Sequence, residues 1–154
     1  MIEAVVFDLD GVLIDSEPVW EQVRHGLVDE RGGRWTSDAQ DQLMGMSTPE
    51  WACYLSDELA VDLPPEQVGA IVVERMASCY AQNLPLMPEA TGTLRRIAGR
   101  WPMALASSSP RALIDAVLAA AGWTRCSGPL FPLKRSATAS PLQMSTWQPC
   151  VDSG

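Results

Sequence analysis

The sequence has little lysine, histidine or cysteine, and these shortages exclude several kinds of site. Lys134 is the only lysine and His25 the only histidine among 154 residues, and the four cysteines show no C-x-x-C spacing. A zinc site is therefore not expected, and the cysteines are interpreted as free thiols in a reducing compartment. No apolar run is long enough to cross a membrane and the start shows no signal-peptide pattern, which predicts a cytoplasmic protein.

Basic residues are scarce overall, and their distribution changes toward the C-terminus. The net charge of −8 argues against binding to nucleic acid or to anionic membrane surfaces. Residues 1–122 hold eighteen acids and eight arginines, whereas residues 123–154 hold three bases and one acid. We expect a monomer.

A pair of acids follows the first apolar stretch. Residues 4–7 precede Asp8, Asp10 and Gly11. Alternate residues of a strand face the same way, so both carboxylates should lie in one crevice at the carboxyl end of a buried strand, where open α/β sheets bind ligands. Two like charges about 4 Å apart repel by about 4 kcal/mol at an effective dielectric of 20, which Mg²⁺ or a proton would offset. Gly11 permits a sharp turn that brings N–H groups near an anion. The alternative is a strand followed by a plain Asp-Gly turn.

The apolar periodicity predicts an α/β fold in which helices interrupt the core. We expect a strand over 2–8, four helices between 16 and 83, a helix over 88–99, a strand over 102–106 and a helix from Ser109 to Gly122. This order is typical of a parallel sheet. The predicted domains are a partial core over 1–15 and 84–122, a helical cap over 16–83 and an irregular tail over 123–154.

Three serines follow the second predicted strand. Ser107 stands at its carboxyl end, and Ser108 and Ser109 lead into a helix. If the two strands are parallel neighbours, Ser107 lies beside Asp8. A hydroxyl and two N–H groups at a helix start suit phosphate oxygens. A plain helix cap is the alternative for the serines alone, but their pairing with the two acids favours a phosphate site.

The stretches FDLDGVLIDSEPVW and LASSSPR resemble motifs I and II of the haloacid dehalogenase-like (HAD) hydrolases. Over residues 2–122 the chain is similar to the branch with a helical cap after motif I, which contains β-phosphoglucomutase, phosphoglycolate phosphatase and sugar-phosphate phosphatases. The resemblance implies an α/β protein with a Rossmann-like parallel sheet, incomplete here, and an inserted four-helix cap.

The resemblance also implies a chemistry. Asp8 would accept the phosphoryl group as an aspartyl-phosphate, and Asp10 would protonate the leaving oxygen and then activate water. Asp8 and the backbone carbonyl of Asp10 would hold Mg²⁺. Ser107 would bind the phosphoryl group, and Gly11, Ser108 and Ser109 are further candidate phosphate-binding residues. The substrate would be a small phosphorylated metabolite, such as a sugar phosphate.

The cap favours a phosphatase over a mutase. Trp20 stands where the mutases have a histidine, and Thr48 where they have a phosphate-binding arginine. A phosphomutase, a haloacid dehalogenase proper and a non-catalytic fragment are the alternatives. His25 is interpreted as structural or solvated.

The tail does not match the family. Neither the motif III lysine nor the motif IV acids follow Gly122 in the expected form, because Lys134 lacks its glycine and proline neighbours. A second reading frame of the gene begins at the third base of each codon after Gly122. Codons that fit the tail can encode LDAVFRAAVSAEEIRHGKPAPDVYLAA in that frame, which contains motif III as GKPAPD. The sequence therefore predicts a frameshift near Gly122, with a divergent natural tail as the alternative. The loss of both motifs predicts weak Mg²⁺ binding, little turnover and poor solubility.

Overall fold

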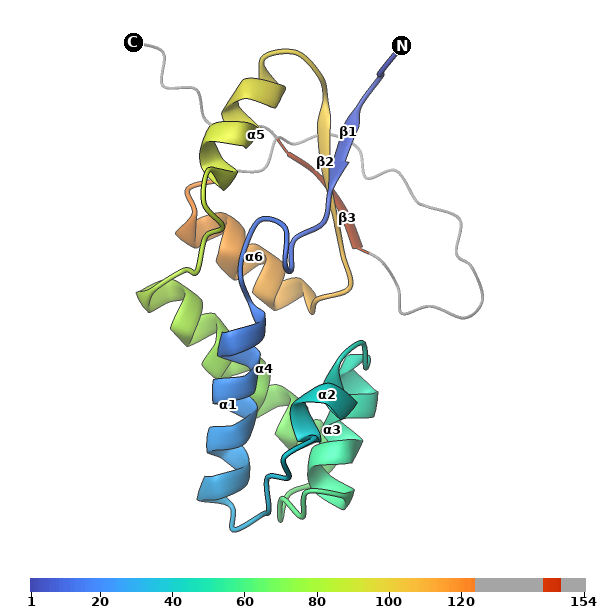
Figure 1. Ribbon diagram of the computed structural model, residues 1–154, viewed down its shortest axis with the longest axis vertical. Helices are drawn as coiled ribbons and strands as arrows, with labels where there is room; N and C mark the ends of the chain where they lie inside the picture. Colours follow the sequence, from blue (N-terminus) through green and yellow to red (C-terminus); the bar gives the residue numbers. More distant parts are fainter. Residues whose placement is uncertain (124–142, 148–154) are drawn as a thin grey trace. The chain divides into compact units, whose positions relative to one another are not determined.

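The computed structural model describes residues 1–123 and the backbone of 143–147. These residues form two compact units (Figure 1). The sheet unit contains Met1–Ser16 and the described residues from Tyr80 on, and the helical unit contains Glu17–Cys79. Each unit has its own buried side chains, so each is described by itself.

The sheet unit is built on three strands in the order β1 (Val5–Phe7), β2 (Met103–Ser107) and β3 (Gln143–Trp147). β1 and β2 are parallel, as expected, and Phe7 lies opposite Leu105. Two helices, α5 (Ala90–Ala98) and α6 (Arg111–Ala120), belong to the same unit. The buried apolar side chains of β2 and α6 come from Met103, Ala104, Leu105, Leu113, Ile114, Val117 and Leu118.

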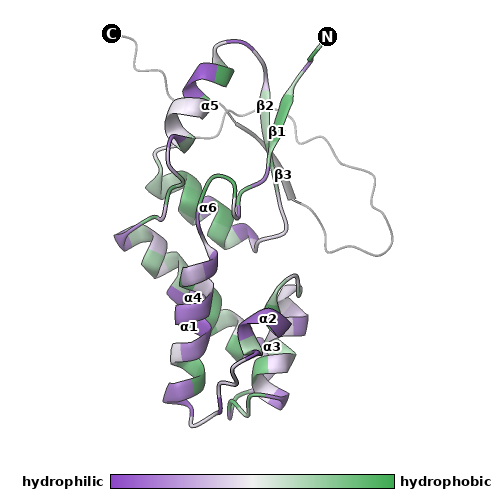
Figure 2. Cartoon of the chain, viewed as in Figure 1, coloured by the Kyte–Doolittle hydropathy of each residue, from purple (hydrophilic) through white to green (hydrophobic). Residues whose placement is uncertain are grey.

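The first strand is shorter and more exposed than predicted. It covers three residues rather than 2–8, and Val6 is 55% exposed although β1 is a hydrophobic segment (Figure 2). The reason is its place in the sheet, because β2 is the one strand that pairs with β1 in the described part of the chain. A parallel strand is buried only when neighbours and helices cover it. The prediction of a buried strand was therefore wrong.

The tail contains a strand that was not predicted. β3 pairs antiparallel with β2, with Leu105 opposite Ser145, so the sheet is mixed rather than purely parallel. The expectation of an irregular tail is wrong for these five residues. The rest of the expected tail, residues 124–142 and 148–154, lies outside the described residues.

The helical unit holds α1 (Glu17–Glu30), α2 (Ala39–Leu43), α3 (Thr48–Asp57) and most of α4 (Pro65–Gln82). The predicted apolar faces are buried at Trp20, Val23, Leu27, Trp51, Leu55, Leu59, Val68, Val72 and Met76. Ser47 caps α3, and the Glu50 carboxylate accepts the backbone N–H of Ser47 at 2.7 Å, which completes a capping box. The four helices expected between 16 and 83 are thus present, though the last ends within the sheet unit.

Candidate active site

The two acids of the first motif stand on a tight turn that follows β1. The carbonyl oxygen of Leu9 accepts the N–H groups of Leu13 and Ile14, and the N–H of Gly11 donates to the Ile14 carbonyl at 2.8 Å. Leu9, Leu13 and Ile14 are buried and anchor the turn. Gly11 has a φ of +74°, while a Cβ there would meet no atom within 4 Å. Glycine is therefore required for its backbone conformation and not for space.

Asp10 is the centre of a hydrogen-bonded cluster. Its Oδ1 accepts the Ser16 hydroxyl at 2.7 Å, and its Oδ2 accepts the hydroxyls of Ser109 at 2.7 Å and Ser107 at 3.3 Å. All three serines are buried, while Asp10 itself is half-buried. Hydroxyl groups therefore solvate this carboxylate where water is largely excluded.

The serine segment after β2 is ordered by the same cluster. The Ser107 hydroxyl accepts the backbone N–H of Ser109 at 3.0 Å, which tightens the turn into α6. Ser109 was considered as a helix cap, but Pro110 stands at the N-cap of α6 and no side-chain cap bond forms. Ser108 is exposed, and in the described structure its side chain does not hydrogen-bond to Asp10. The structure thus joins Ser107 and Ser109 to Asp10.

Asp8 is separate from this cluster and open to solvent. Its Oδ1 accepts the backbone N–H of Leu9 at 2.7 Å, and its side chain is exposed. Register explains the difference, because Phe7 pairs with Leu105 and the serine at 107 therefore lies beyond Asp8. The expected neighbour of Ser107 was Asp8, whereas the hydrogen-bonded partner is Asp10.

The donors for a cation are few but accessible. No group of three or more His, Cys, Asp or Glu side chains in the described ranges could together hold a metal ion. Asp8 offers an exposed carboxylate, and the Asp10 carbonyl accepts no backbone hydrogen bond from a described residue. Mg²⁺ keeps several waters and commonly takes one or two protein ligands together with phosphate oxygens. These two oxygens fit that partial donor set.

Ser16 is the member of the cluster that the sequence did not reveal. It was interpreted only as a helix cap, because serine before Glu-Pro is a common helix start. Its side chain is fully buried and its hydroxyl donates to Asp10 instead. In the sequence, the available signal was that Ser16 follows Asp10 by six residues within the same motif. That spacing does not establish a contact, because the contact depends on the geometry of the turn.

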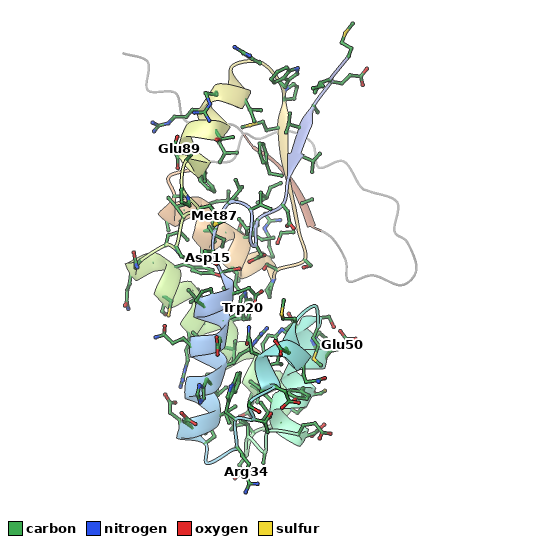
Figure 3. All side chains as sticks on the ribbon, in the orientation of Figure 1. Asp15, Trp20, Arg34, Glu50, Met87 and Glu89 are labelled. Carbon is green, nitrogen blue, oxygen red and sulfur yellow. The ribbon has the colours of Figure 1, made fainter. Side chains whose placement is uncertain are left out.

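The helical unit contains its own polar features. His25 stacks on Trp35 with ring centroids 4.8 Å apart and lies 3.5 Å from Asp29, at a partly exposed place. Trp20 is buried (its position on α1 is labelled in Figure 3), and Thr48 begins α3. Arg24, which the sequence did not single out, is buried between Trp20 and Trp51.

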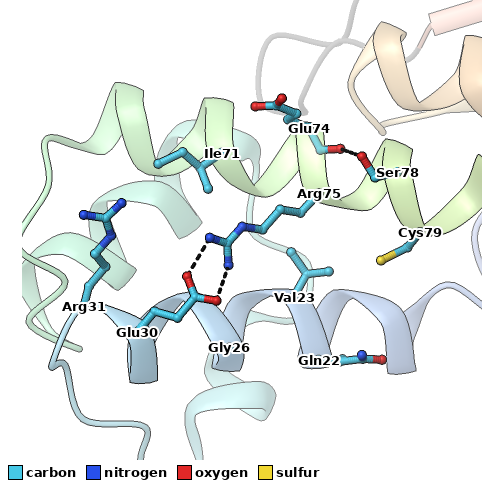
Figure 4. A pocket seen from close by; sticks show the side chains of 10 residues that line it. All are labelled: Gln22, Val23, Gly26, Glu30, Arg31, Ile71, Glu74, Arg75, Ser78 and Cys79. Atoms are coloured by element: carbon cyan, nitrogen blue, oxygen red, sulfur yellow. Dashed lines mark hydrogen bonds and ion pairs between the residues drawn. The ribbon is translucent and has the colours of Figure 1, made fainter.

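A shallow groove of the helical unit runs between α1 and α4 (Figure 4). Arg75 extends into it, and both oxygens of Glu30 accept its guanidinium N–H groups at 3.0 and 2.6 Å. The same contact lowers the pKa of Glu30 from its usual range. The guanidinium of Arg75 is therefore already paired in this groove, which Arg31 also lines.

The geometry of the turn, with an exposed acid, a serine-solvated acid and a serine from the adjacent strand, agrees with the family that the motifs resemble. The model of the haloacid dehalogenase-like hydrolases matches residues 2–132. The chain belongs to this family. The phosphorylated carbohydrates phosphatase of Thermotoga maritima is 29% identical over 71% of this chain and 51% of its own length.

Solved structures share the fold of this chain. A HAD family hydrolase from Deinococcus radiodurans, with bound phosphate and sodium, is 30% identical with a TM-score of 0.53 and covers 79% of this chain and 53% of its own. CbbY from Rhodobacter sphaeroides in complex with phosphate is 22% identical with a TM-score of 0.63, over 78% and 57% of the two chains. The chain spans about half the length of the curated relatives that it matches first.

Proposed function

We propose that this chain carries the phosphoryl-transfer residues of a Mg²⁺-dependent phosphatase of small phosphorylated metabolites. The observation that carries the proposal is the turn after β1, where an exposed Asp8 precedes an Asp10 held by three serine hydroxyls. A nucleophile must be open to its substrate, whereas a general acid must be held in one place. The two acids have those different surroundings.

The proposed reaction has two steps. An Asp8 oxygen attacks phosphorus, the bond from phosphorus to the leaving oxygen breaks, and Asp10 gives its proton to that oxygen. Asp10 then takes a proton from water, which attacks the aspartyl-phosphate and releases phosphate with Asp8 restored. The hydroxyl of Ser107 and the N–H groups of Ser108, Ser109 and the Gly11 turn are the proposed phosphate contacts. Bound between Asp8 and the Asp10 carbonyl, Mg²⁺ would supply positive charge against the phosphoryl oxygens.

Sugar phosphates are the proposed substrates. The support is the relative from Thermotoga maritima, whose name states that it acts on phosphorylated carbohydrates. The described residues contain no lysine, since Lys134 lies outside them. A phosphate and Asp8 together carry several negative charges. Because no lysine is present among the described residues, Mg²⁺ alone must offset those charges there. We therefore propose that the chain binds phosphate mimics weakly and turns substrate over slowly. A cytoplasmic location stays a prediction.

The test uses beryllofluoride, a mimic of the phosphoryl group on an aspartate, observed by ¹⁹F NMR on the whole chain. We expect a bound signal that requires Mg²⁺ and disappears in Asp8→Asn. The matched control is Asp15→Asn, because Asp15 is an exposed acid on the same loop (Figure 3). A bound signal that survives in Asp8→Asn, or no bound signal at any Mg²⁺ concentration, would contradict the proposal.

A further inference from the structure

The groove between α1 and α4 is open above a glycine. Its volume is about 690 Å³, and Val23, Gly26, Ile71 and Cys79 supply its apolar atoms (Figure 4). Gly26 lies within α1 and has no positive φ, and a Cβ added to it would meet no other part of the chain within 4 Å. The helical unit by itself therefore requires no glycine at this position.

A glycine in this place suits the close approach of another element. Glycine inside a helix is less favourable than alanine, and it is used where another group must come near the backbone. Gln22, Gly26 and Glu30 are four residues apart, so they share the face of α1 that lines the groove. Gly26 thus leaves a notch in the middle of that face, bordered by apolar atoms.

Two charged side chains of the groove have no partner. Glu30 and Arg75 bind each other. Arg31 and Glu74 also line the groove, but no ion pair or side-chain hydrogen bond of the described residues includes the Arg31 guanidinium or the Glu74 carboxylate. The bond from Arg75 is the main cause of the lowered pKa of Glu30, and the charge of Arg31 adds a smaller effect. One base and one acid are therefore left for a contact outside the unit.

The charges of the groove balance, unlike those of the helical unit as a whole. Residues 17–79 contain twelve acids and four arginines, whereas two glutamates and two arginines line the groove. Two copies of so acidic a unit repel each other across most surfaces, but not here. No charged or polar side chain that lines the groove is buried, so it lacks the convergent buried polar groups of a small-molecule site.

We propose that the groove between α1 and α4 is a self-association surface, on which the helical unit of a second copy of this chain docks about a two-fold axis. In such an interface each contact occurs twice, with the roles of the copies exchanged. Arg31 of each copy pairs with Glu74 of the other, and Gly26 admits the docked copy. The proposal replaces the monomer expected from the sequence and uses no residue of the proposed phosphatase site.

The association should be weak and reversible. Ten residues line the groove, fewer than the roughly 20–30 on each side of a stable interface. Sedimentation velocity of the whole chain over a concentration series should show a mean sedimentation coefficient that rises with concentration. Gly26→Leu fills the notch and should weaken the association at least tenfold. Its melting temperature, measured on dilute protein, should not fall, because the added side chain enters open space.

Charge reversal tests the proposed ion pair. Arg31→Glu and Glu74→Arg should each weaken the association at least tenfold, because each places like charges together at both copies of the contact. The matched controls are Arg34→Glu and Glu58→Arg, which make the same changes of charge at exposed positions outside the groove. Both controls should associate as the parent chain does.

Mixing the two reversed variants gives the sharpest result. A pair made of one Arg31→Glu copy and one Glu74→Arg copy again joins opposite charges at both contacts, whereas a pair of identical variants joins like charges. Native mass spectrometry separates the three kinds of pair by mass, and we expect the mixed pair to exceed both others. A parent chain that is monomeric at every concentration, association that persists in Gly26→Leu, or no excess of the mixed pair would overturn the proposal.

Discussion

The Ser109 hydroxyl donates a 2.7 Å hydrogen bond to the Asp10 carboxylate across ninety-nine positions of the chain. This bond connects the turn after β1 with the turn after β2. It follows from the parallel pairing of the two strands, which places both carboxyl ends at one edge of the sheet. The two motifs that are far apart in the sequence thus form one site.

Ser109→Ala tests how much this hydrogen bond contributes to the stability of the sheet unit. Removing it leaves a half-buried carboxylate with one donor fewer, and hydrogen bonds to charged groups contribute about 1.5–3 kcal/mol. We expect the free energy of unfolding of the sheet unit to fall by about that amount, measured by urea denaturation. Ser108→Ala is the control, because Ser108 is exposed and lies in the same turn. Equal losses in the two variants would show that the bond is not formed.

Two glycine substitutions should have opposite effects. Gly11→Ala puts a side chain on a residue with φ of +74°, which should cost about 1–2 kcal/mol. Gly26→Ala, in the middle of α1 where a Cβ meets nothing within 4 Å, should instead stabilise the helical unit by about 1 kcal/mol. Urea denaturation measures both. A neutral Gly11→Ala would mean that the turn can adopt a different backbone conformation.

The capping box of α3 should make stability depend on acid pH. Hydrogen bonds from the hydroxyl and the backbone N–H of Ser47 lower the pKa of Glu50 below its usual value. Because the folded pKa is the lower one, the contribution is present above the unfolded pKa and is lost as pH falls through the folded pKa. Thermal melts should show Glu50→Gln less stable than the parent near neutral pH, with the difference vanishing in acid. Glu21→Gln, an exposed change on α1, should show no such dependence.

The reading frame after Gly122 gives a prediction at the level of the gene. In the frame that starts at the third base, Trp123-Thr124 encodes aspartate and Trp147-Gln148 encodes alanine whatever codons are used. We expect the gene, sequenced downstream from the Gly122 codon, to continue in that frame through GKPAP to an acidic motif IV. A prompt stop codon in that frame would contradict the frameshift and make the tail a natural one.

The fold of the first 122 residues could be predicted because its signals are local. The burial of Val68, Val72 and Met76 follows from their spacing of four residues on a helix, and the capping box at Ser47 follows from residue types three apart. The burial of β1 could not be predicted, because it depends on how many strands pair with it. Strand composition alone does not show whether a strand is central or at an edge.

The candidate site was predictable only in part for the same reason. The two motifs follow predicted strands, so parallel pairing predicted that they would meet, but it placed Ser107 beside Asp8, whereas Ser107 bonds to Asp10. The contacts of Ser16 and the stacking of Arg24 on two tryptophans depend on how turns and helices pack. Nothing in the spacing of Arg24 distinguishes it from a surface arginine of an amphipathic helix.

The most direct test of the central claim identifies the residue that takes the phosphoryl group. The whole chain is incubated with Mg²⁺ and acetyl phosphate, reduced with borohydride, which converts an aspartyl-phosphate to homoserine, and mapped by peptide mass spectrometry. The account predicts homoserine at position 8 in the parent chain and in Asp15→Asn. Conversion at Asp10 or Asp15, or none at any aspartate, would contradict it.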